Sequence, residues 1–185
     1  MEKRGKLIIL SGPSGVGKGT VRLALIRRPE LNLFYSVSMT TRPIRAGEVD
    51  GRDYIFVTRE KFEEEIKKGN LLEWNEFVGN LYGTPLPAVE KMRDDGKNVL
   101  LEIDVNGQSN VVRKCPDAVT IFLLPPNLES LEARIRGRRT ESEEVIRERL
   151  DKANAELKKA WRYQYRVYND DVERAADEIA SIILK

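Results

Sequence analysis

The feature that most constrains this chain is a glycine-rich segment, Gly12-Pro-Ser-Gly-Val-Gly-Lys18, which fits the spacing G-x-x-x-x-G-K. It comes directly after the apolar run 7–10 and directly before a stretch with helical periodicity. In that setting backbone N–H groups turn inward around a phosphate, the helix start adds positive charge, and the lysine reaches the outer phosphates. A glycine turn with a surface lysine would explain the same letters, but the strand–loop–helix order favours a phosphate site.

The segment departs from the usual pattern at one position. Phosphate loops commonly continue with Ser or Thr, whose hydroxyl binds Mg²⁺, whereas this chain has Gly19 followed by Thr20. Thr20 is therefore a candidate phosphate contact. We expect Mg²⁺ to come with a bound nucleotide and to be held largely by the nucleotide oxygens and water, and we assign it no side-chain ligand.

The apolar pattern predicts an α/β fold with a central parallel sheet flanked by helices. Buried strands are expected at 7–10, 35–38, 99–103 and 119–124, and helical stretches separate the first, third and fourth. Helices are expected after the glycine loop, near 59–68, after Pro85, over 128–136 behind an Asn127 N-cap, and at the C-terminus. A further helix follows Thr140, with one apolar stripe of Ile146, Leu150, Ala153, Leu157 and Trp161.

Residues 36–84 break this alternation with short strands and many Gly and Thr residues. We interpret them as an inserted lobe on a core formed by 1–35 and 85–185. The polar excursion 137–142 is interpreted as a mobile flap, within a lid of about 134–149.

Composition excludes several classes of function. Histidine is absent, which rules out histidine bases, Ser-His-Asp triads and His-ligated zinc. A net charge of +2 is too small to indicate general binding to nucleic acid or to a membrane surface, and no apolar run is long enough to span a bilayer. A single cysteine forms no internal disulfide, and the first apolar run is too short for a signal peptide, so a cytoplasmic location is expected.

The inserted lobe carries a candidate second anion site. Arg42 and Arg45 are three residues apart and Tyr54 follows, and guanidinium forks bind phosphate oxygens bidentately. Taken alone, this pair would be interpreted as a solvated basic loop.

Together these segments resemble the guanylate kinase family, over nearly the whole chain and in the right order. The motifs that carry the resemblance are Ser11-Gly-Pro-Ser-Gly, Thr41-Arg42 with Arg45-Ala-Gly-Glu48, Leu72-Glu73-Trp74, Gly79-Asn-Leu-Tyr82-Gly83-Thr84, Glu102-Ile-Asp104 and Asn169-Asp170. The resemblance implies a P-loop nucleoside-monophosphate-kinase fold with an inserted GMP-binding lobe and a small lid. It also implies transfer of the γ-phosphoryl group of ATP to GMP, and to dGMP, in purine nucleotide metabolism.

The resemblance further implies roles for individual residues. The GMP-binding residues would be Ser38, Arg42, Arg45, Glu48, Tyr54, Glu73, Tyr82, Thr84, Glu102 and Asp104. The ATP-binding residues would be Gly12, Pro13, Ser14, Gly15, Val16, Gly17, Lys18, Gly19, Thr20, Arg134 and Asn169. The catalytic residues would be Lys18, Arg42, Arg138 and Arg149.

Physical chemistry supports several of these roles. Guanine presents two adjacent donors, N1–H and the N2 amino group, and the acceptor-only carboxylate of Glu73 matches both, although an exposed carboxylate at a strand end is the alternative. Arg134 would stack beside adenine, while Arg138 and Arg149 would neutralise charge on the transferring group. Asn169 would contact the adenine side, with a turn or cap as its alternative. Arg139 stands where the family usually has Gly.

Three other functions remain open at this point. A scaffold domain of the same fold would bind phosphopeptides, but Lys18, Arg42 and Arg45 are all present. A kinase for another phosphorylated small molecule would not need Ser38 and Glu73. A nucleic-acid-stimulated ATPase is disfavoured by the near-neutral charge.

Overall fold

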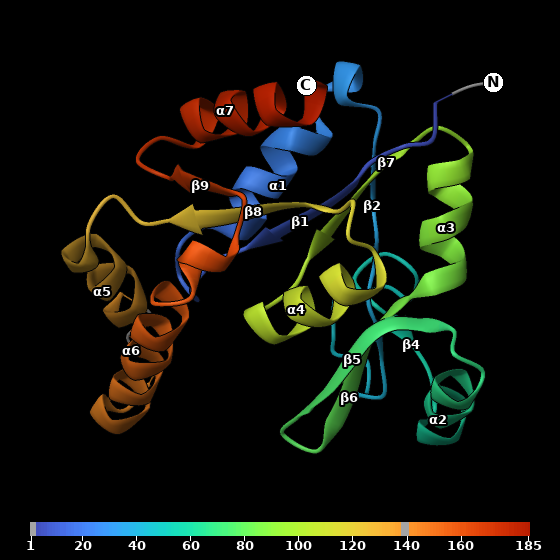
Figure 1. Ribbon diagram of the computed structural model, residues 1–185. Helices are drawn as coiled ribbons and strands as arrows, with labels where there is room; N and C mark the ends of the chain where they lie inside the picture. Colours follow the sequence, from blue (N-terminus) through green and yellow to red (C-terminus); the bar gives the residue numbers. More distant parts are fainter. Residues whose placement is uncertain (1–2, 138–140) are drawn as a thin grey trace.

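A five-stranded parallel sheet forms the core of the computed structural model, which describes residues 3–137 and 141–185 (Figure 1). Its strand order is β2-β7-β1-β8-β9. The strands are β1 (Leu7–Ser11), β2 (Leu33–Tyr35), β7 (Asn98–Glu102), β8 (Val119–Leu124) and β9 (Tyr165–Tyr168). Strand β1 lies at the centre and all five of its residues are buried, so the glycine loop that follows it emerges at the middle of the carboxyl edge of the sheet.

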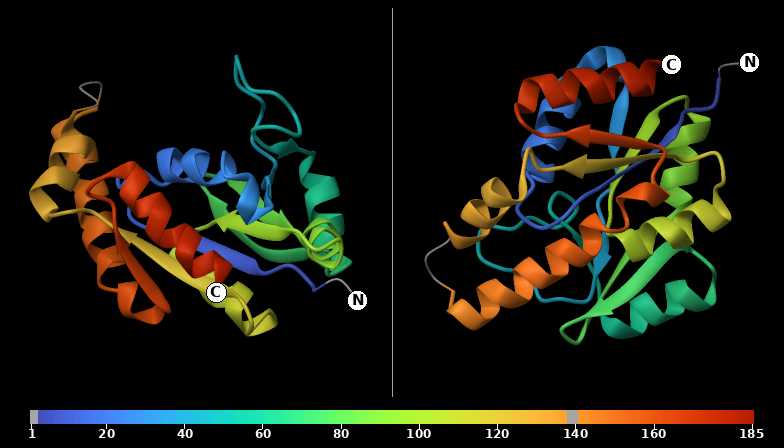
Figure 2. Two further views of the ribbon diagram at one scale, coloured as in Figure 1. Left: turned by 90° about the horizontal axis from the view of Figure 1, so that it is seen from above. Right: turned by 60° about the vertical axis from the view of Figure 1, so that its left-hand side comes forward.

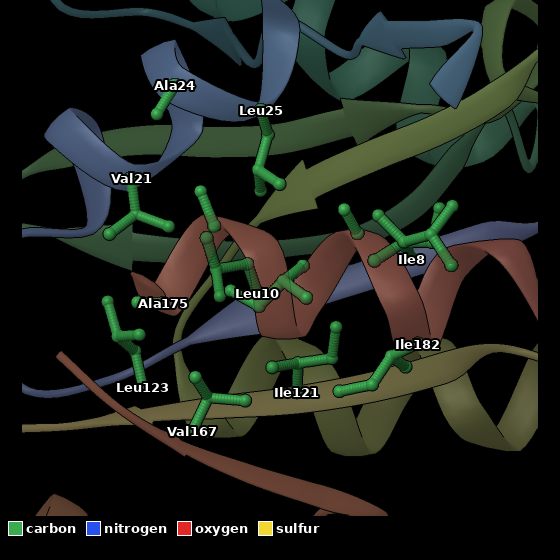
Figure 3. Packing of buried hydrophobic residues seen from close by; sticks show 14 of the residues in the cluster. Ile8, Leu10, Val21, Ala24, Leu25, Ile121, Leu123, Val167, Ala175 and Ile182 are labelled. Carbon is green, nitrogen blue, oxygen red and sulfur yellow. The ribbon is translucent and has the colours of Figure 1, made fainter. Parts of the chain in front are cut away.

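Helices cover both faces of this sheet because the strand side chains alternate. Ile8 and Leu10 of β1 pack on one face with α1 (Lys18–Ile26) and α7 (Val172–Leu184), as Figure 3 shows. Leu7 and Ile9 pack on the other face. That second face is covered by α3 (Leu86–Asp94), α4 (Val105–Lys114) and the short turn η2 (Ala160–Arg162).

A second sheet of four strands, in the order β4-β3-β6-β5, forms a separate layer. It consists of β3 (Met39–Thr40), β4 (Ile55–Phe56), β5 (Leu71–Phe77) and β6 (Asn80–Pro85). Helix α2 (Arg59–Lys67) starts behind the N-cap Thr58 and buries Phe62 against this sheet. Strands β5 and β6 pair as an antiparallel hairpin within this second sheet.

The helices α5 (Leu128–Arg136) and α6 (Glu143–Leu157) form a small layer of their own. They pack through Leu131, Ile135, Ile146 and Ala153. Figure 2 shows this pair at one end of the molecule and the second sheet at the other, with α1 between them. The short turn η1 (Pro29–Leu31) completes the set of described elements.

Two expectations from the sequence need correction, and one strand was missed. The strand expected at 35–38 is β2, Leu33–Tyr35. Ser36 still donates to the Leu100 carbonyl at 3.0 Å, and the chain leaves the sheet after it. The edge strand β9 was not anticipated, because only Val167 of its four residues is buried and no apolar run marks it. Trp161 does not continue the stripe of α6, which ends at Leu157, and it is 73% exposed.

The architecture of a central parallel sheet with flanking helices is confirmed. Among residues 3–137 and 141–185, none of the helices has the length and apolar character needed to cross a bilayer.

Candidate active site

The phosphate loop lies where the carboxyl end of β1 meets the start of α1. Gly15 and Gly17 have φ angles of 85° and 97°, a backbone conformation that residues with a side chain rarely adopt. Gly17 is also the N-cap of α1. Gly12 has no room for a side chain, since a Cβ would lie 2.7 Å from the Leu123 carbonyl oxygen. Glycine is therefore required at these three positions for the loop to adopt this shape.

This loop forms one wall of a cavity of about 470 Å³, a size suited to a nucleotide. Residues that line the cavity are Pro13, Ser14, Gly15, Gly17, Lys18, Gly19, Thr20, Glu102, Arg134 and Arg149. Three cationic side chains thus surround it, and one carboxylate, Glu102, faces it from β7.

Lys18 is the cation closest in sequence to the loop. Its ammonium group donates to the carbonyl oxygens of Gly12 and Pro13. Burial lowers the pKa of Lys18, while the carboxylates of Glu102 and Glu156 act in the opposite direction. A lysine held in this way is a partly desolvated positive charge, which attracts phosphate more strongly than a lysine in water does.

Two arginines from the α5–α6 pair reach the loop. Arg149 donates to the Ser14 hydroxyl at 3.1 Å and to the Glu141 carboxylate at 2.7 Å. Arg134 donates to the Val16 carbonyl at 3.0 Å. The third expected lid arginine, Arg138, lies outside the described residues, as does Arg139.

A second cavity, of about 190 Å³, lies between the second sheet and the carboxyl end of β7. It is lined by Ser38, Tyr54, Glu73, Asn75, Tyr82, Gly83, Glu102, Ile103 and Asp104. Glu102 therefore lines both this cavity and the one at the phosphate loop. The two cavities adjoin, so that ligands in them would lie side by side.

Glu73 is the most strongly buried acid of this second cavity. It lies on β5, paired with Thr84 of β6, and only 8% of it is exposed. The Thr84 hydroxyl donates to Glu73 Oε1 at 2.8 Å, while Glu73 Oε2 lies 3.1 Å from where a Cβ on Gly107 would be. Burial raises the pKa of Glu73, and the charge of Asp104 adds to this effect, while the Thr84 hydrogen bond opposes it.

Asp104 lines the second cavity and is also the N-cap of helix α4. One carboxylate oxygen caps the helix by accepting from the Gly107 N–H at 2.7 Å, and the other accepts from the Asn75 side-chain amide at 3.3 Å. The carboxylate thus ties the end of β7 to strand β5. Asn75 was not singled out from the sequence, since no motif in β5 marks it.

Arg42 and Glu48 form a bidentate ion pair with both N···O distances at 2.8 Å. Glu48 also accepts from the Arg45 backbone N–H at 2.8 Å. The Arg42 hydrogen bonds, together with that backbone bond, hold the pKa of Glu48 at about 2. The Arg42 guanidinium also lies 5.2 Å from the centre of the Tyr54 ring, so the loop presents Arg42 in a fixed orientation.

A third cavity, of about 290 Å³, continues the second toward this arginine loop. Its lining includes Ser38, Glu48, Tyr54 and Glu102, together with Arg22, Tyr35 and Asp53. Among the residues that the structure describes, neither Arg42 nor Arg45 lines the second or the third cavity. Arg42 is nevertheless fixed beside Glu48, which lines the third cavity.

Arg22 is a site residue that the sequence motifs did not indicate. It donates to Glu102 at 2.6 Å and to the Tyr35 hydroxyl at 3.1 Å, with its guanidinium 4.5 Å from the Tyr35 ring centre. Its position four residues after Lys18 places both on one face of α1, and this spacing is the signal that could have identified it.

Asn169 lies beneath the phosphate loop. It is 2% exposed, and its side-chain amide donates to the Val16 carbonyl at 2.8 Å.

Comparisons with known proteins agree with this arrangement. A family model described as guanylate kinase matches residues 4–185. The chain is 56% identical to a guanylate kinase of Lactococcus lactis over 183 residues, which is 99% of this chain and 89% of that protein. It is 54% identical to a guanylate kinase of Streptococcus pyogenes, over 99% of this chain and 87% of that one.

The fold is similar to the crystal structure of a guanylate kinase from Anaplasma phagocytophilum, with a TM-score of 0.78 and 35% sequence identity. That match covers 99% of this chain and 86% of the other. The full-length match, the phosphate loop and the two adjoining cavities together establish that this chain belongs to the guanylate kinase family.

Proposed function

We propose that this chain is an ATP:GMP phosphotransferase that moves the γ-phosphoryl group of ATP to GMP, and to dGMP, giving ADP and GDP. The observation that carries the proposal is Glu73, a buried acceptor-only carboxylate in a cavity that adjoins the phosphate loop. Guanine presents two neighbouring donors to such a group, whereas adenine presents a bare acceptor and would leave the carboxylate unpaired. Sites of this kind discriminate between bases by about 10⁴ or more.

In this proposal the inserted lobe of residues 36–84 binds GMP. Ser38 and Glu73, with Thr84 bonded to Glu73, recognise the base, and Asp104 and Glu102 line the same cavity. The phosphate of GMP is held by Tyr54, Tyr82 and the arginines Arg42 and Arg45, and Glu48 keeps Arg42 in place. Arginine forks suit this task because they bind phosphate oxygens in pairs.

ATP is bound by the core of residues 1–35 and 85–185, with its phosphates on the loop that ends in Lys18. Arg149 and Arg138, from the lid of about 134–149, supply positive charge to the transferring group. The contact between Arg149 and Ser14 supports this role, since it brings the lid arginine to the loop. Stabilisation of this kind commonly contributes several kcal/mol in phosphoryl transfer, on the order of 10³-fold or more in rate.

The residues present fit a magnesium ion that is carried by ATP. Thr20 and Glu102 offer oxygens at the loop cavity, while the residues that the structure describes contain no cluster of three metal-binding side chains. This donor set suits Mg²⁺, which keeps most of its waters and binds phosphates with one or two protein oxygens. When bound, Mg²⁺ neutralises charge on the phosphate oxygens.

The chemistry needs no general base from the protein. The second pKa of a phosphate monoester lies near ~6, so the attacking oxygen of GMP is already ionised at neutral pH. What the chain supplies is alignment of two anions, cancellation of their repulsion by Lys18 and the arginines, and exclusion of water from the closed site. The lack of histidine is consistent with this mechanism.

The test is a coupled assay of ADP formation from ATP with GMP, dGMP, AMP, CMP or UMP as acceptor. We expect turnover with GMP and dGMP only. The proposal would be refuted if AMP, CMP or UMP were phosphorylated at a rate similar to that of GMP, or if no acceptor were phosphorylated. A cytoplasmic location and the lack of a nucleic-acid partner stay predictions from the sequence.

A further inference from the structure

Arg22 is a partly buried cation of the site that has no role in the proposed function so far. It lies on α1, and its side chain is 26% exposed. Its Nη1 atom donates to Glu102 Oε2 at 2.6 Å and to the Tyr35 hydroxyl at 3.1 Å. The guanidinium also lies 4.5 Å from the centre of the Tyr35 ring, whose face attracts cations. Partners on two different strands, β2 and β7, therefore hold Arg22 in one place.

Glu102, the acid that Arg22 contacts, lines all three cavities of the site. It is the last residue of β7. Lys18 lies one turn before Arg22 on α1 and lines the loop cavity together with Glu102. Burial lowers the pKa of Lys18, and the charge of Glu102 opposes this effect. Two cations on one face of α1 thus lie beside a single carboxylate.

A carboxylate in this position works against the binding of anions. In the proposed function, phosphate groups occupy the loop cavity on one side of Glu102 and the region of the arginine loop on the other. An unpaired negative charge between them would repel both, and more strongly as water leaves the site. The ion pair with Arg22 cancels this charge before any ligand binds.

The ion pair also leaves Glu102 able to contact a ligand. Arg22 bonds to Oε2, whereas Oε1 accepts no hydrogen bond from the residues 3–137 and 141–185. A carboxylate oxygen can accept from a hydroxyl group, from an amino group or from water on a bound cation. Because Arg22 fixes one oxygen, the other is presented to the site in one orientation.

We infer that Arg22 is a positioning residue for both nucleotides, which acts through Glu102 by orienting the carboxylate and cancelling its charge. This inference rests on the proposed function, since it requires anions on both sides of Glu102. It predicts that Arg22 matters only while residue 102 is negatively charged. An arginine that bound phosphate directly, or that only stabilised the fold, would matter whichever residue stood at position 102.

The test is a double-mutant cycle with Arg22→Met and Glu102→Gln. The dissociation constants of GMP and of inorganic tripolyphosphate are measured separately by calorimetry. Arg22→Met alone should weaken both ligands by roughly 10-fold or more, which corresponds to the loss of one hydrogen bond to a charged group. In the Glu102→Gln background, the same replacement should change either constant by less than about 3-fold.

A second variant separates charge from shape. Arg22→Lys keeps the positive charge, so it should bind both ligands within about 3-fold of wild type. Binding as weak as that of Arg22→Met would overturn the inference. If Arg22→Met does not fold, Arg22→Gln removes the same charge and keeps a polar side chain in its place.

Three results of the cycle would contradict the role of Arg22. An equal loss in both backgrounds would show that Arg22 acts on the ligands or on the fold directly. Unchanged binding in Arg22→Met would show that the ion pair has no effect on either ligand. A loss confined to one ligand would also overturn the inference, because Glu102 lines the cavities assigned to both.

The matched control is Arg28→Met, at the far end of α1 from the phosphate loop. Arg28 is 20% exposed and pairs with Asp177 at 2.7 Å and with Glu173 at 3.3 Å. Its replacement should lower the melting temperature without weakening either ligand. Each dissociation constant is measured with one ligand and without turnover, so the result does not depend on catalysis. A wild-type chain that binds both ligands but makes no GDP would refute the proposed function alone.

Discussion

Replacing Glu73 with glutamine tests the central specificity argument with the smallest possible change of shape. The carboxylate lies on β5, is 8% exposed, and already receives one hydrogen bond from Thr84 at 2.8 Å. Glutamine keeps one oxygen but puts an NH₂ group where the second oxygen stood. That NH₂ group would face one of the two guanine donors, so one hydrogen bond is lost and the other is no longer charge-assisted.

The expected size of the effect follows from these two changes. A hydrogen bond to a charged group contributes about 1.5–3 kcal/mol, and a buried donor left unpaired costs about 1–3 kcal/mol. A loss of about 3–4 kcal/mol corresponds to a fall of roughly 10²- to 10³-fold in kcat/KM for GMP. IMP lacks the N2 amino group and keeps N1–H, so the preference for GMP over IMP should narrow.

The assay is coupled ADP formation with GMP or IMP as acceptor, together with ATP binding measured without acceptor, which should be unchanged. The matched control is Glu76→Gln, the same chemical change on the same strand at an exposed side chain. A value of kcat/KM for GMP within about 5-fold of wild type would refute the assignment of Glu73 to the guanine base.

The same variant has a predicted signature in stability. Because burial raises the pKa of Glu73, the carboxyl group stabilises the fold only at low pH, and this contribution is lost as the pH rises through the raised pKa. Glu73→Gln should therefore melt at a higher temperature than wild type at pH 7–8 in the absence of ligand. The difference should shrink as the pH falls below the ordinary range of glutamate, and a lower melting temperature of the variant at pH 8 would contradict this reasoning.

Four further predictions follow from the site. Lys18→Met removes the ammonium group at the phosphate loop and should lower kcat by at least about 10²-fold while GMP binding persists; retained kcat would count against the role of Lys18. Arg149→Lys keeps the charge but loses the guanidinium fork that reaches Ser14, and kcat should fall about 10-fold or more, with little effect on KM for GMP. Glu48→Gln removes the ion pair that orients Arg42 and should raise KM for GMP about 3- to 10-fold. Because the pKa of Glu48 is about 2, the Arg42–Glu48 pair of the wild type should stay intact from pH 8 to pH 4 and weaken only as the pH approaches 2. GMP with a non-hydrolysable ATP analogue should compact the chain in solution scattering, and an unchanged radius of gyration at saturation would argue against closure.

The general plan of this protein can be predicted from its amino-acid pattern. Continuous apolar runs predicted the buried parallel strands β1, β7 and β8. A strand that is covered on both faces needs apolar residues at successive positions, and this pattern can be recognised in the local sequence. The spacing of Gly12, Gly17 and Lys18 predicted the phosphate loop, since positive φ angles and close backbone approach demand glycine. The absence of histidine is a property of composition alone, and it is sufficient to exclude imidazole-based mechanisms.

How these parts meet depends on the three-dimensional packing of the chain. That packing placed the edge strand β9, brought Asn75 to Asp104 and paired Arg22 with Glu102. It also put Glu102 in the lining of three cavities. It placed the Asn169 amide under the loop, bonded to the Val16 carbonyl. These facts depend on distances between residues far apart in the chain and on which polar atoms are buried. Packing of the whole chain sets both, whereas local periodicity and turn chemistry encode neither.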